Sequence, residues 1–124
     1  MSAKILVVDD EQDVALLFQQ KFRKEIKANQ VMFHFALSGE DALDFLRNQL
    51  TADFVMILSD INMPGMGGYE LLKRIKLEFS RLKVFLITAY GDQRSYQTAM
   101  AGGADGFITK PINFDDLKEK IFNL

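Results

Sequence analysis

The chain has 124 residues, of which 48% are hydrophobic, and a formal net charge of −2. This length suits one domain with a buried core, and the charge provides no positive field for nucleic acid or an anionic membrane. The absence of cysteine excludes disulfides, thiol catalysis and thiolate zinc sites. No stretch predicts a membrane span and the amino terminus has no signal-peptide pattern, so we expect a cytoplasmic protein.

Strand-like and helix-like segments alternate along the first half of the chain. Residues 5–8 form an apolar run that predicts a strand. Apolar residues then recur at helical spacing and predict a helix over residues 11–26, with an inward face of Val14, Leu17, Phe18, Phe22 and Ile26. Residues 31–36 predict a second strand. Ser38 is suited to cap a following helix, whose inward residues are Ala42, Leu43, Leu46 and Leu50.

The second half of the chain continues the alternation. Residues 54–58 are apolar throughout, as expected for a strand that helices cover on both faces. The segment 62–68 is rich in proline and glycine and predicts a loop. The remaining elements are a helix through Leu72, Ile75 and Phe79, a strand at 82–87, a helix at 92–101 ended by Gly102 and Gly103, a strand at 104–108, and a helix through Phe114, Leu117 and Ile121.

This order of elements predicts an α/β fold with a doubly wound, five-stranded parallel sheet and right-handed crossovers. Periodicity does not reveal the strand order. The flavodoxin-like order 2-1-3-4-5 is common for five strands and puts strands 1 and 3 at the switch point. We expect residues 1–124 to form one domain.

Polar residues follow four of the predicted strands. Asp9 and Asp10 follow the first, Asp60 the third, Thr88 the fourth and Lys110 the fifth. The carboxyl ends of parallel strands share one edge, where ligands bind in open α/β sheets. Carboxylates gathered at one site resist ionising together without a cation. The pattern therefore predicts a site for a divalent metal and a phosphoryl group.

Each of these residues also has a simpler explanation. Asp60 can attack phosphorus and form an acyl phosphate, or it can bond its own backbone in a turn. Asp9 and Asp10 suit Mg²⁺, but either can instead cap the next helix. Lys110 can bind phosphoryl oxygens or be a solvated loop lysine, and Thr88 can donate a hydrogen bond or simply end a strand. Their joint placement favours phosphoryl transfer to a carboxylate.

Four segments resemble a known family. They are Val-Val-Asp-Asp-Glu at 7–11, Ser-Asp-Ile-Asn-Met-Pro-Gly-Met at 59–66, Thr-Ala-Tyr at 88–90 and Gly-Phe-Ile-Thr-Lys-Pro at 106–111. With them, essentially the whole chain resembles a receiver domain of the two-component response-regulator family, which has the fold of the chemotaxis response regulator. The resemblance implies a phosphoprotein that catalyses its own phosphorylation and dephosphorylation, not an enzyme with a separate substrate.

The resemblance also implies roles for the site residues. Asp60 would accept the phosphoryl group from a phosphohistidine on a sensor histidine kinase or a phosphotransfer protein. Asp10 and Asp60 would ligate Mg²⁺, with Mn²⁺ as an alternative metal, while Asp9 would act mainly through water. The backbone carbonyl of Asn62 would supply another ligand.

Further residues would bind the phosphoryl group and pass on its effect. Lys110, Thr88 and the backbone N–H of Ala89 would bind phosphoryl oxygens, and a cis peptide bond would precede Pro111. Phosphorylation would draw Thr88 toward the site and change the rotamer of Phe107, unless that residue is only a core aromatic. The surface of the helix at 92–101, the last strand and the last helix would then bind a downstream partner, an output domain or a second copy.

The chain departs from the family pattern at three places. Phe107 stands where the family often has tyrosine, Gly67 stands where an acid is frequent, and the segment 23–30 is longer than in compact members. Tyr90 and Asn62 would flank the path of an attacking water and affect the lifetime of the acyl phosphate.

Two other classes share parts of this pattern. Haloacid-dehalogenase-like phosphatases also use an aspartyl nucleophile, Mg²⁺ and a lysine, but they need an acid two residues after the nucleophile, where this chain has Asn62. A flavin-binding domain of similar topology needs glycines and open amides after the first strand, where this chain has acids. The sequence predicts no direct nucleic-acid or membrane partner, and it leaves open whether the domain acts alone or within a longer regulator.

Overall fold

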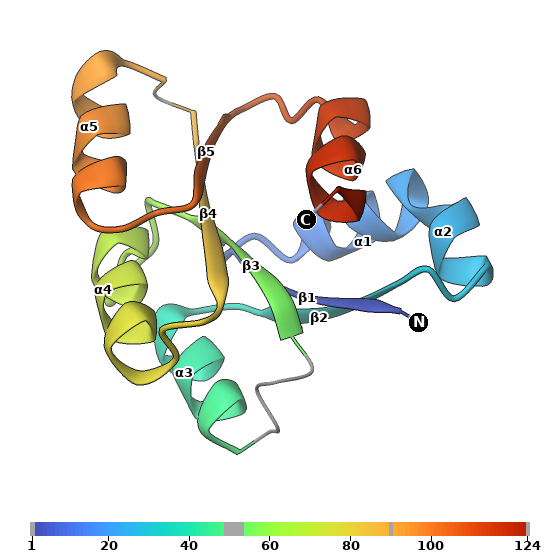
Figure 1. Ribbon diagram of the computed structural model, residues 1–124, viewed down its shortest axis with the longest axis horizontal. Helices are drawn as coiled ribbons and strands as arrows, with labels where there is room; N and C mark the ends of the chain where they lie inside the picture. The colour runs from blue at the N-terminus through green and yellow to red at the C-terminus, as the bar shows by residue number, and fades with distance from the viewer. Residues whose placement is uncertain (1, 49–53, 90, 124) are drawn as a thin grey trace.

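The computed structural model describes residues 2–48, 54–89 and 91–123 (Figure 1). All strand pairs are parallel, and the sheet has the order β2-β1-β3-β4-β5, which confirms the predicted fold class and strand order. The strands are β1 (Ala3–Val8), β2 (Val31–Ala36), β3 (Phe54–Asp60), β4 (Lys83–Thr88) and β5 (Gly106–Thr109).

Helices cover both faces of this sheet. They are α1 (Asp13–Lys21), α2 (Arg23–Lys27), α3 (Gly39–Arg47), α4 (Gly68–Glu78), α5 (Gln93–Ala101) and α6 (Phe114–Phe122). In Figure 1, α1, α2 and α6 lie on one side of the sheet and α3, α4 and α5 on the other. Within the described ranges, no helix has the length and hydropathy needed to cross a lipid bilayer.

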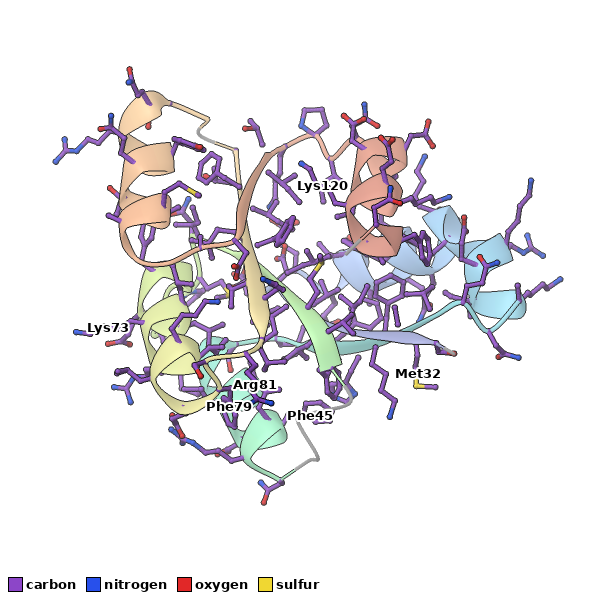
Figure 2. The ribbon with its side chains drawn as sticks, viewed as in Figure 1. Met32, Phe45, Lys73, Phe79, Arg81 and Lys120 are labelled. Carbon is purple, nitrogen blue, oxygen red and sulfur yellow. The ribbon has the colours of Figure 1, made fainter. Side chains whose placement is uncertain are left out.

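The apolar strands divide their side chains between two cores, which fill the spaces between sheet and helices (Figure 2). Successive side chains of a strand point to opposite faces. In β3, Met56 and Leu58 therefore join the core beneath α1 and α6, while Ile57 joins the core beneath α3 and α4. Val55, at the start of the strand, is 37% exposed, so the expectation that residues 54–58 are covered throughout is wrong at that position.

The helix predicted over residues 11–26 is two helices. It begins at Asp13, and Phe22 interrupts it with φ −105° and ψ 19°. Hydrogen bonds from Phe22 N–H to the Phe18 carbonyl and from Ile26 N–H to the Phe22 carbonyl keep the two helices nearly continuous. Phe18 and Phe22 are fully buried, but Leu17 is 39% exposed because it lies about a quarter-turn from Phe18 on α1.

The predicted start of α3 is confirmed. The Ser38 hydroxyl oxygen accepts a hydrogen bond from Asp41 N–H at 3.0 Å, which satisfies one of the free amides of the first turn. Asp92 caps α5 in the same way by accepting from Ser95 N–H at 2.7 Å. Leu50, predicted to face inward from this helix, lies outside the described residues.

Asp105 joins three elements at the amino-terminal ends of the strands. Its Oδ2 accepts hydrogen bonds from Val84 N–H at 2.9 Å and from Lys76 Nζ at 2.7 Å, and Lys83 Nζ lies 3.8 Å from Oδ1. These bonds outweigh the effect of partial burial and lower the pKa of Asp105 below its ordinary value. Asp105 therefore holds the end of α4 and the starts of β4 and β5 together.

Candidate functional site

The parallel register brings the predicted acids together at the carboxyl ends of two central strands. β1 pairs with β3, with Val8 opposite Ser59, so the residues that follow Val8 lie beside Asp60. Asp9 and Asp60 are buried, whereas Asp10 is exposed. Each of the three carboxylates offers an oxygen atom, and these atoms all lie within 4.8 Å of one another.

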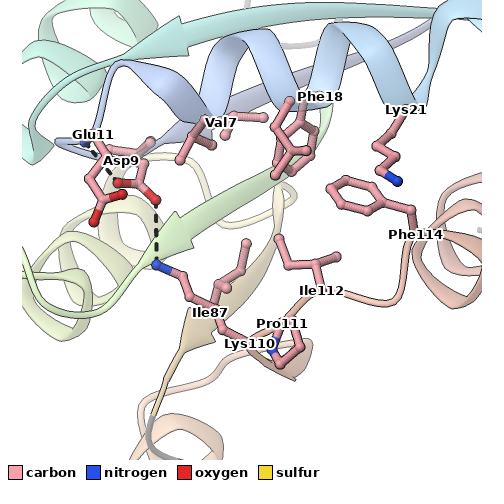
Figure 3. Close-up of a pocket in the computed structure, with 13 residues that line it drawn as sticks. Val7, Asp9, Glu11, Phe18, Lys21, Ile87, Lys110, Pro111, Ile112 and Phe114 are labelled. Carbon is pink, nitrogen blue, oxygen red and sulfur yellow. Dashed lines mark hydrogen bonds and ion pairs between the residues drawn. The ribbon is translucent and has the colours of Figure 1, made fainter.

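Lys110 reaches this cluster from the end of β5. Its Nζ lies 3.5 Å from Asp60 Oδ1. The same atom lies 3.8 Å from Asp9 Oδ2 (Figure 3). The backbone N–H of Lys110 donates to the Thr88 carbonyl at 2.7 Å, which ties the lysine to the end of β4. The Lys110–Pro111 peptide bond is cis, as the resemblance implies.

Burial raises the pKa of both buried carboxyl groups. For Asp60, the nearby Lys110 opposes this effect without cancelling it, so the pKa stays above the ordinary value. For Asp9, a backbone hydrogen bond and Lys110 oppose burial, while the negative charge of Asp60 adds to it. The cluster thus has more negative charge than its one ammonium neutralises, and a divalent cation would favour the ionised forms.

Neither Asp9 nor Asp10 caps α1, so that alternative is wrong. The N-cap residue is Gln12, and it makes no capping bond with its side chain. Asp9 Oδ1 instead accepts from Glu11 N–H at 2.9 Å within the turn that leaves β1 (Figure 3). This turn holds one Asp9 oxygen, while the other faces Lys110.

The donor set fits a hard divalent cation. Mg²⁺ prefers oxygen ligands, takes one or two carboxylates and keeps several waters. Asp9, Asp10 and Asp60 could hold it, and the exposure of Asp10 leaves room for water on one side. Asn62, whose carbonyl is a further candidate, is exposed two residues after Asp60. When bound, the cation would neutralise negative charge on the carboxylates and on a phosphoryl group.

Thr88 and Ala89 lie at the end of the neighbouring strand, β4. Thr88 ends β4 and is buried, one residue beyond Ile87, the partner of Asp60 in the β3–β4 ladder. Ala89 follows it and is exposed. Tyr90, expected to flank the path of a water, lies outside the described residues.

Gly68 sets the shape of the loop after Asp60, a role that the sequence analysis missed. The segment 62–67 is a loop as predicted, and α4 begins at Gly68. A Cβ atom on Gly68 would lie 2.4 Å from the Asp60 carbonyl oxygen and 2.7 Å from Ile61 Cα. Because both neighbours are backbone, only glycine fits, and the start of α4 can pack directly against the strand end that presents Asp60. The run of glycines at 65, 67 and 68 was the available signal.

Phe107 lies in β5. It is partly buried against the core beneath α3 and α4 and meets Tyr96 of α5 edge to face, with ring centroids 5.7 Å apart. Tyr96 is 49% exposed, so this aromatic pair connects the interior to the outer surface of α5.

An apolar pocket of about 390 Å³ opens beside the carboxylate cluster (Figure 3). Its walls come from β1, α1 and the segment that joins β5 to α6, and include Leu17, Phe18, Ile112 and Phe114. Asp9 and Lys110 line the end of the pocket nearest to Asp60. The pocket explains why Leu17 is partly exposed despite its apolar character.

Comparisons with known proteins agree with this geometry. The family model described as "Response regulator receiver domain" matches residues 5–122. The chain is 32% identical to sporulation initiation phosphotransferase F of Bacillus subtilis, over 98% of this chain and 92% of that protein. It is 33% identical to chemotaxis protein CheY-3 of Vibrio cholerae, over 95% and 88%. A solved structure of V. cholerae CheY4 has a TM-score of 0.85 at 25% identity and covers 99% of this chain and 98% of that one.

The chain therefore belongs to the response-regulator receiver family of two-component signalling. The resemblance noted in the sequence is confirmed. The phosphatase alternative has no support from these comparisons, and the chain has Asn62 where that class needs an acid.

Proposed function

We propose that this receiver domain is a phosphorylation-controlled switch in which Asp60 accepts a phosphoryl group. The observation that carries the proposal is the cluster of Asp60 with Asp9 and Asp10, whose oxygens lie within 4.8 Å of one another, and with Lys110 at 3.5 Å. This arrangement has the acids for a divalent metal and the ammonium for phosphoryl oxygens in one place. We further propose that the receiver domain occupies the whole of residues 1–124.

In the proposed reaction, an oxygen of the ionised Asp60 carboxylate attacks the phosphorus of a phosphohistidine. The new P–O bond forms as the P–N bond to the histidine breaks, and the electron pair leaves with the imidazole nitrogen. Lys110, Thr88 and the N–H of Ala89 bind the oxygens of the transferred group. Mg²⁺ or Mn²⁺ would be held by Asp10, Asp60 and the Asn62 carbonyl, with Asp9 acting mainly through water.

The donor would be a sensor histidine kinase or a phosphotransfer protein. Its histidine must come within bonding distance of Asp60, so the donor has to cover the surface around that residue. The apolar pocket lined by Leu17 and Ile112 lies next to Asp60 and can bury apolar side chains of the donor. This agrees with the name of the B. subtilis relative, which describes that protein as a phosphotransferase. A cytoplasmic location stays a prediction.

The proposed output is a change at the surface of α5, β5 and α6. Thr88 would move toward the bound phosphoryl group, and Phe107 would take the space that Thr88 leaves. Because Phe107 contacts the half-exposed Tyr96, its movement would alter the outer surface of α5. A downstream protein, an output domain or a second copy would bind the altered surface.

Intact-mass spectrometry after incubation with acetyl phosphate tests this proposal. We expect a Mg²⁺-dependent gain of one phosphoryl group by the natural chain and no gain by the Asp60→Asn variant. Circular dichroism of the variant controls for folding. Equal labelling of the folded variant, or labelling that does not depend on a divalent metal, would contradict the proposal.

A further inference from the structure

Strand β2 is the less protected edge of the sheet. It pairs with β1 alone within the described ranges. Natural edge strands are usually short or carry charges or proline, which discourages pairing with other chains. The opposite edge, β5, follows this rule with four residues, but β2 has six, reads Val-Met-Phe-His-Phe-Ala and contains no Asp, Glu, Lys, Arg or Pro. The β2 edge is therefore suited to pairing with another strand.

The bonding pattern identifies the backbone groups that face outward. Ala3 N–H donates to the Gln30 carbonyl and Asp9 N–H donates to the Ala36 carbonyl, both at 3.0 Å. In a parallel ladder, alternate residues of a strand direct both backbone groups to the same neighbour. The even-numbered residues of β2 therefore face β1. The residues whose N–H and C=O groups face away are Val31, Phe33 and Phe35.

A groove with a basic rim runs beside this edge. The cavity has a volume of about 430 Å³, and its apolar lining includes Phe33, Phe35 and Ile26. Arg23 and Lys27 line it from α2, four residues apart and both exposed. Neither forms an ion pair with any described residue. The edge thus combines free backbone groups, apolar surface and two unpaired positive charges.

We propose that β2 binds an extended, acidic segment of a partner protein as a sixth strand. Backbone bonds to the outward groups of Val31, Phe33 and Phe35 would supply affinity, as in other cases of strand addition. Apolar side chains of the segment would fill the groove, and its carboxylates would pair with Arg23 and Lys27. The charges would select acidic segments from other extended chains.

A second copy of this chain fits the edge less well. It would offer its own β2, which has no acidic residue, and it would bring its own Arg23 and Lys27 into the same interface. Like charges placed together disfavour such a pair. Charge therefore favours an acidic partner over self-association.

Hydrogen exchange measured by NMR tests the proposal at single residues. The probe is a peptide of about eight residues, blocked at both ends, in which valine and glutamate take turns at every second position and threonine fills the positions between. Since every second side chain of a strand points to the same face, the valines and glutamates can both reach the groove and its basic rim. We expect the amides of Val31, Phe33 and Phe35 to exchange at least about tenfold more slowly with the peptide bound. The amides of Met32 and His34 already bond to β1 and should change little. Absence of binding, or binding without this alternation, would overturn the proposal.

Matched peptides and protein variants separate the contribution of charge pairing to binding from that of backbone hydrogen bonds. A peptide with lysine in place of glutamate, and the acidic peptide methylated on its backbone nitrogens, should each bind at least about tenfold more weakly. The Arg23→Glu/Lys27→Glu double variant should lose the acidic peptide and gain the basic one. Lys24→Glu changes an exposed charge on the same helix that does not line the groove, and it should leave binding nearly unchanged. Protection of the same amides in the free protein, with a doubled mass in sedimentation, would instead establish self-pairing.

Discussion

Carboxylates at the two ends of the sheet face opposite electrostatic situations. At the amino-terminal end, Asp105 has two lysines and a backbone amide within reach, and its pKa is lowered. At the carboxyl end, Asp9 and Asp60 share one lysine at 3.8 and 3.5 Å, and their pKa values are raised. The protein's own lysines therefore neutralise the charge of Asp105, whereas the charge of the carboxylate cluster is neutralised only when cations are added. Excess negative charge, not the presence of acids, marks the functional end.

The two ends should differ most in phosphoryl acceptance, which can be tested with the variants Asp60→Asn and Asp105→Asn. Both substitutions remove one carboxylate that lies near a lysine. We expect Asp60→Asn to lose acceptance from acetyl phosphate completely and Asp105→Asn to keep it, because only Asp60 lies within the acid cluster. Intact-mass spectrometry measures the phosphorylated fraction of each variant. The two ends would not differ in this way if Asp105→Asn also lost acceptance while it stayed folded.

Loss of metal affinity at the carboxyl end should be a smaller effect than loss of phosphoryl acceptance. Removing a group that merely orients a metal ligand typically costs 10–100-fold in affinity, so losing a ligand such as Asp10 should weaken Mg²⁺ binding by at least about tenfold. Because Asp10 is exposed, Asp10→Ala should leave the fold intact. Isothermal titration with MgCl₂ measures the affinity, and Asp13→Ala, which changes an acid at the start of α1, is the control. An unchanged Mg²⁺ affinity would show that the metal does not bind at this cluster.

For the free energy of unfolding the order should be reversed, with the larger loss from substitution at the amino-terminal end. Asp105→Ala leaves Val84 N–H without its acceptor and Lys76 without its closest carboxylate, and a buried donor left unpaired costs about 1–3 kcal/mol. Urea unfolding should therefore show a loss of this size. Asp105→Asn keeps an acceptor oxygen and should lose less. A smaller loss for Asp105→Ala than for Asp105→Asn would show that Asp105 does not hold these elements together.

The strand ends were the part of the site that the sequence predicted well. Each apolar run indicated a strand, and the residue after each run fell at the shared edge because the sheet is parallel. The clustering of Asp9, Asp10 and Asp60 followed from strand order alone. Strand order itself was taken from a common topology, because periodicity reports which face a residue occupies but not which strand lies beside it.

Features that depend on distant partners were not predicted. Asp105 falls within the strand predicted at 104–108, but β5 begins only at Gly106. The partners of Asp105, Val84 and Lys76, are 21 and 29 residues away in the chain. Leu17 has the helical spacing of a core residue, yet it lines a surface pocket because Phe18 takes the buried face of α1. Local pattern determines the elements, whereas these details depend on how the elements pack.

The pH dependence of stability offers the finest distinction between the two ends. In the absence of divalent metal, the raised pKa values of Asp9 and Asp60 mean that the folded state binds more protons than the unfolded state just above the ordinary carboxyl range. Their contribution is complete below the ordinary value and is lost as the pH rises through the folded pKa. The lowered pKa of Asp105 acts oppositely, since its contribution is present above the ordinary value and is lost as the pH falls through the folded pKa.

Plots of the free energy of unfolding against pH should therefore depart from that of the natural chain in opposite directions for Asp60→Asn and Asp105→Asn. Relative to the natural chain, Asp60→Asn should gain stability as the pH rises from the ordinary carboxyl value toward neutrality, by on the order of 1 kcal/mol or less. Asp105→Asn should instead show its deficit at neutral pH and recover part of it in acid. Urea unfolding at a series of pH values, with chelator present, measures both. Parallel curves for the two variants would mean that the charges at the two ends act alike, whereas divergence that disappears when Mg²⁺ is added would assign the excess charge to the metal site.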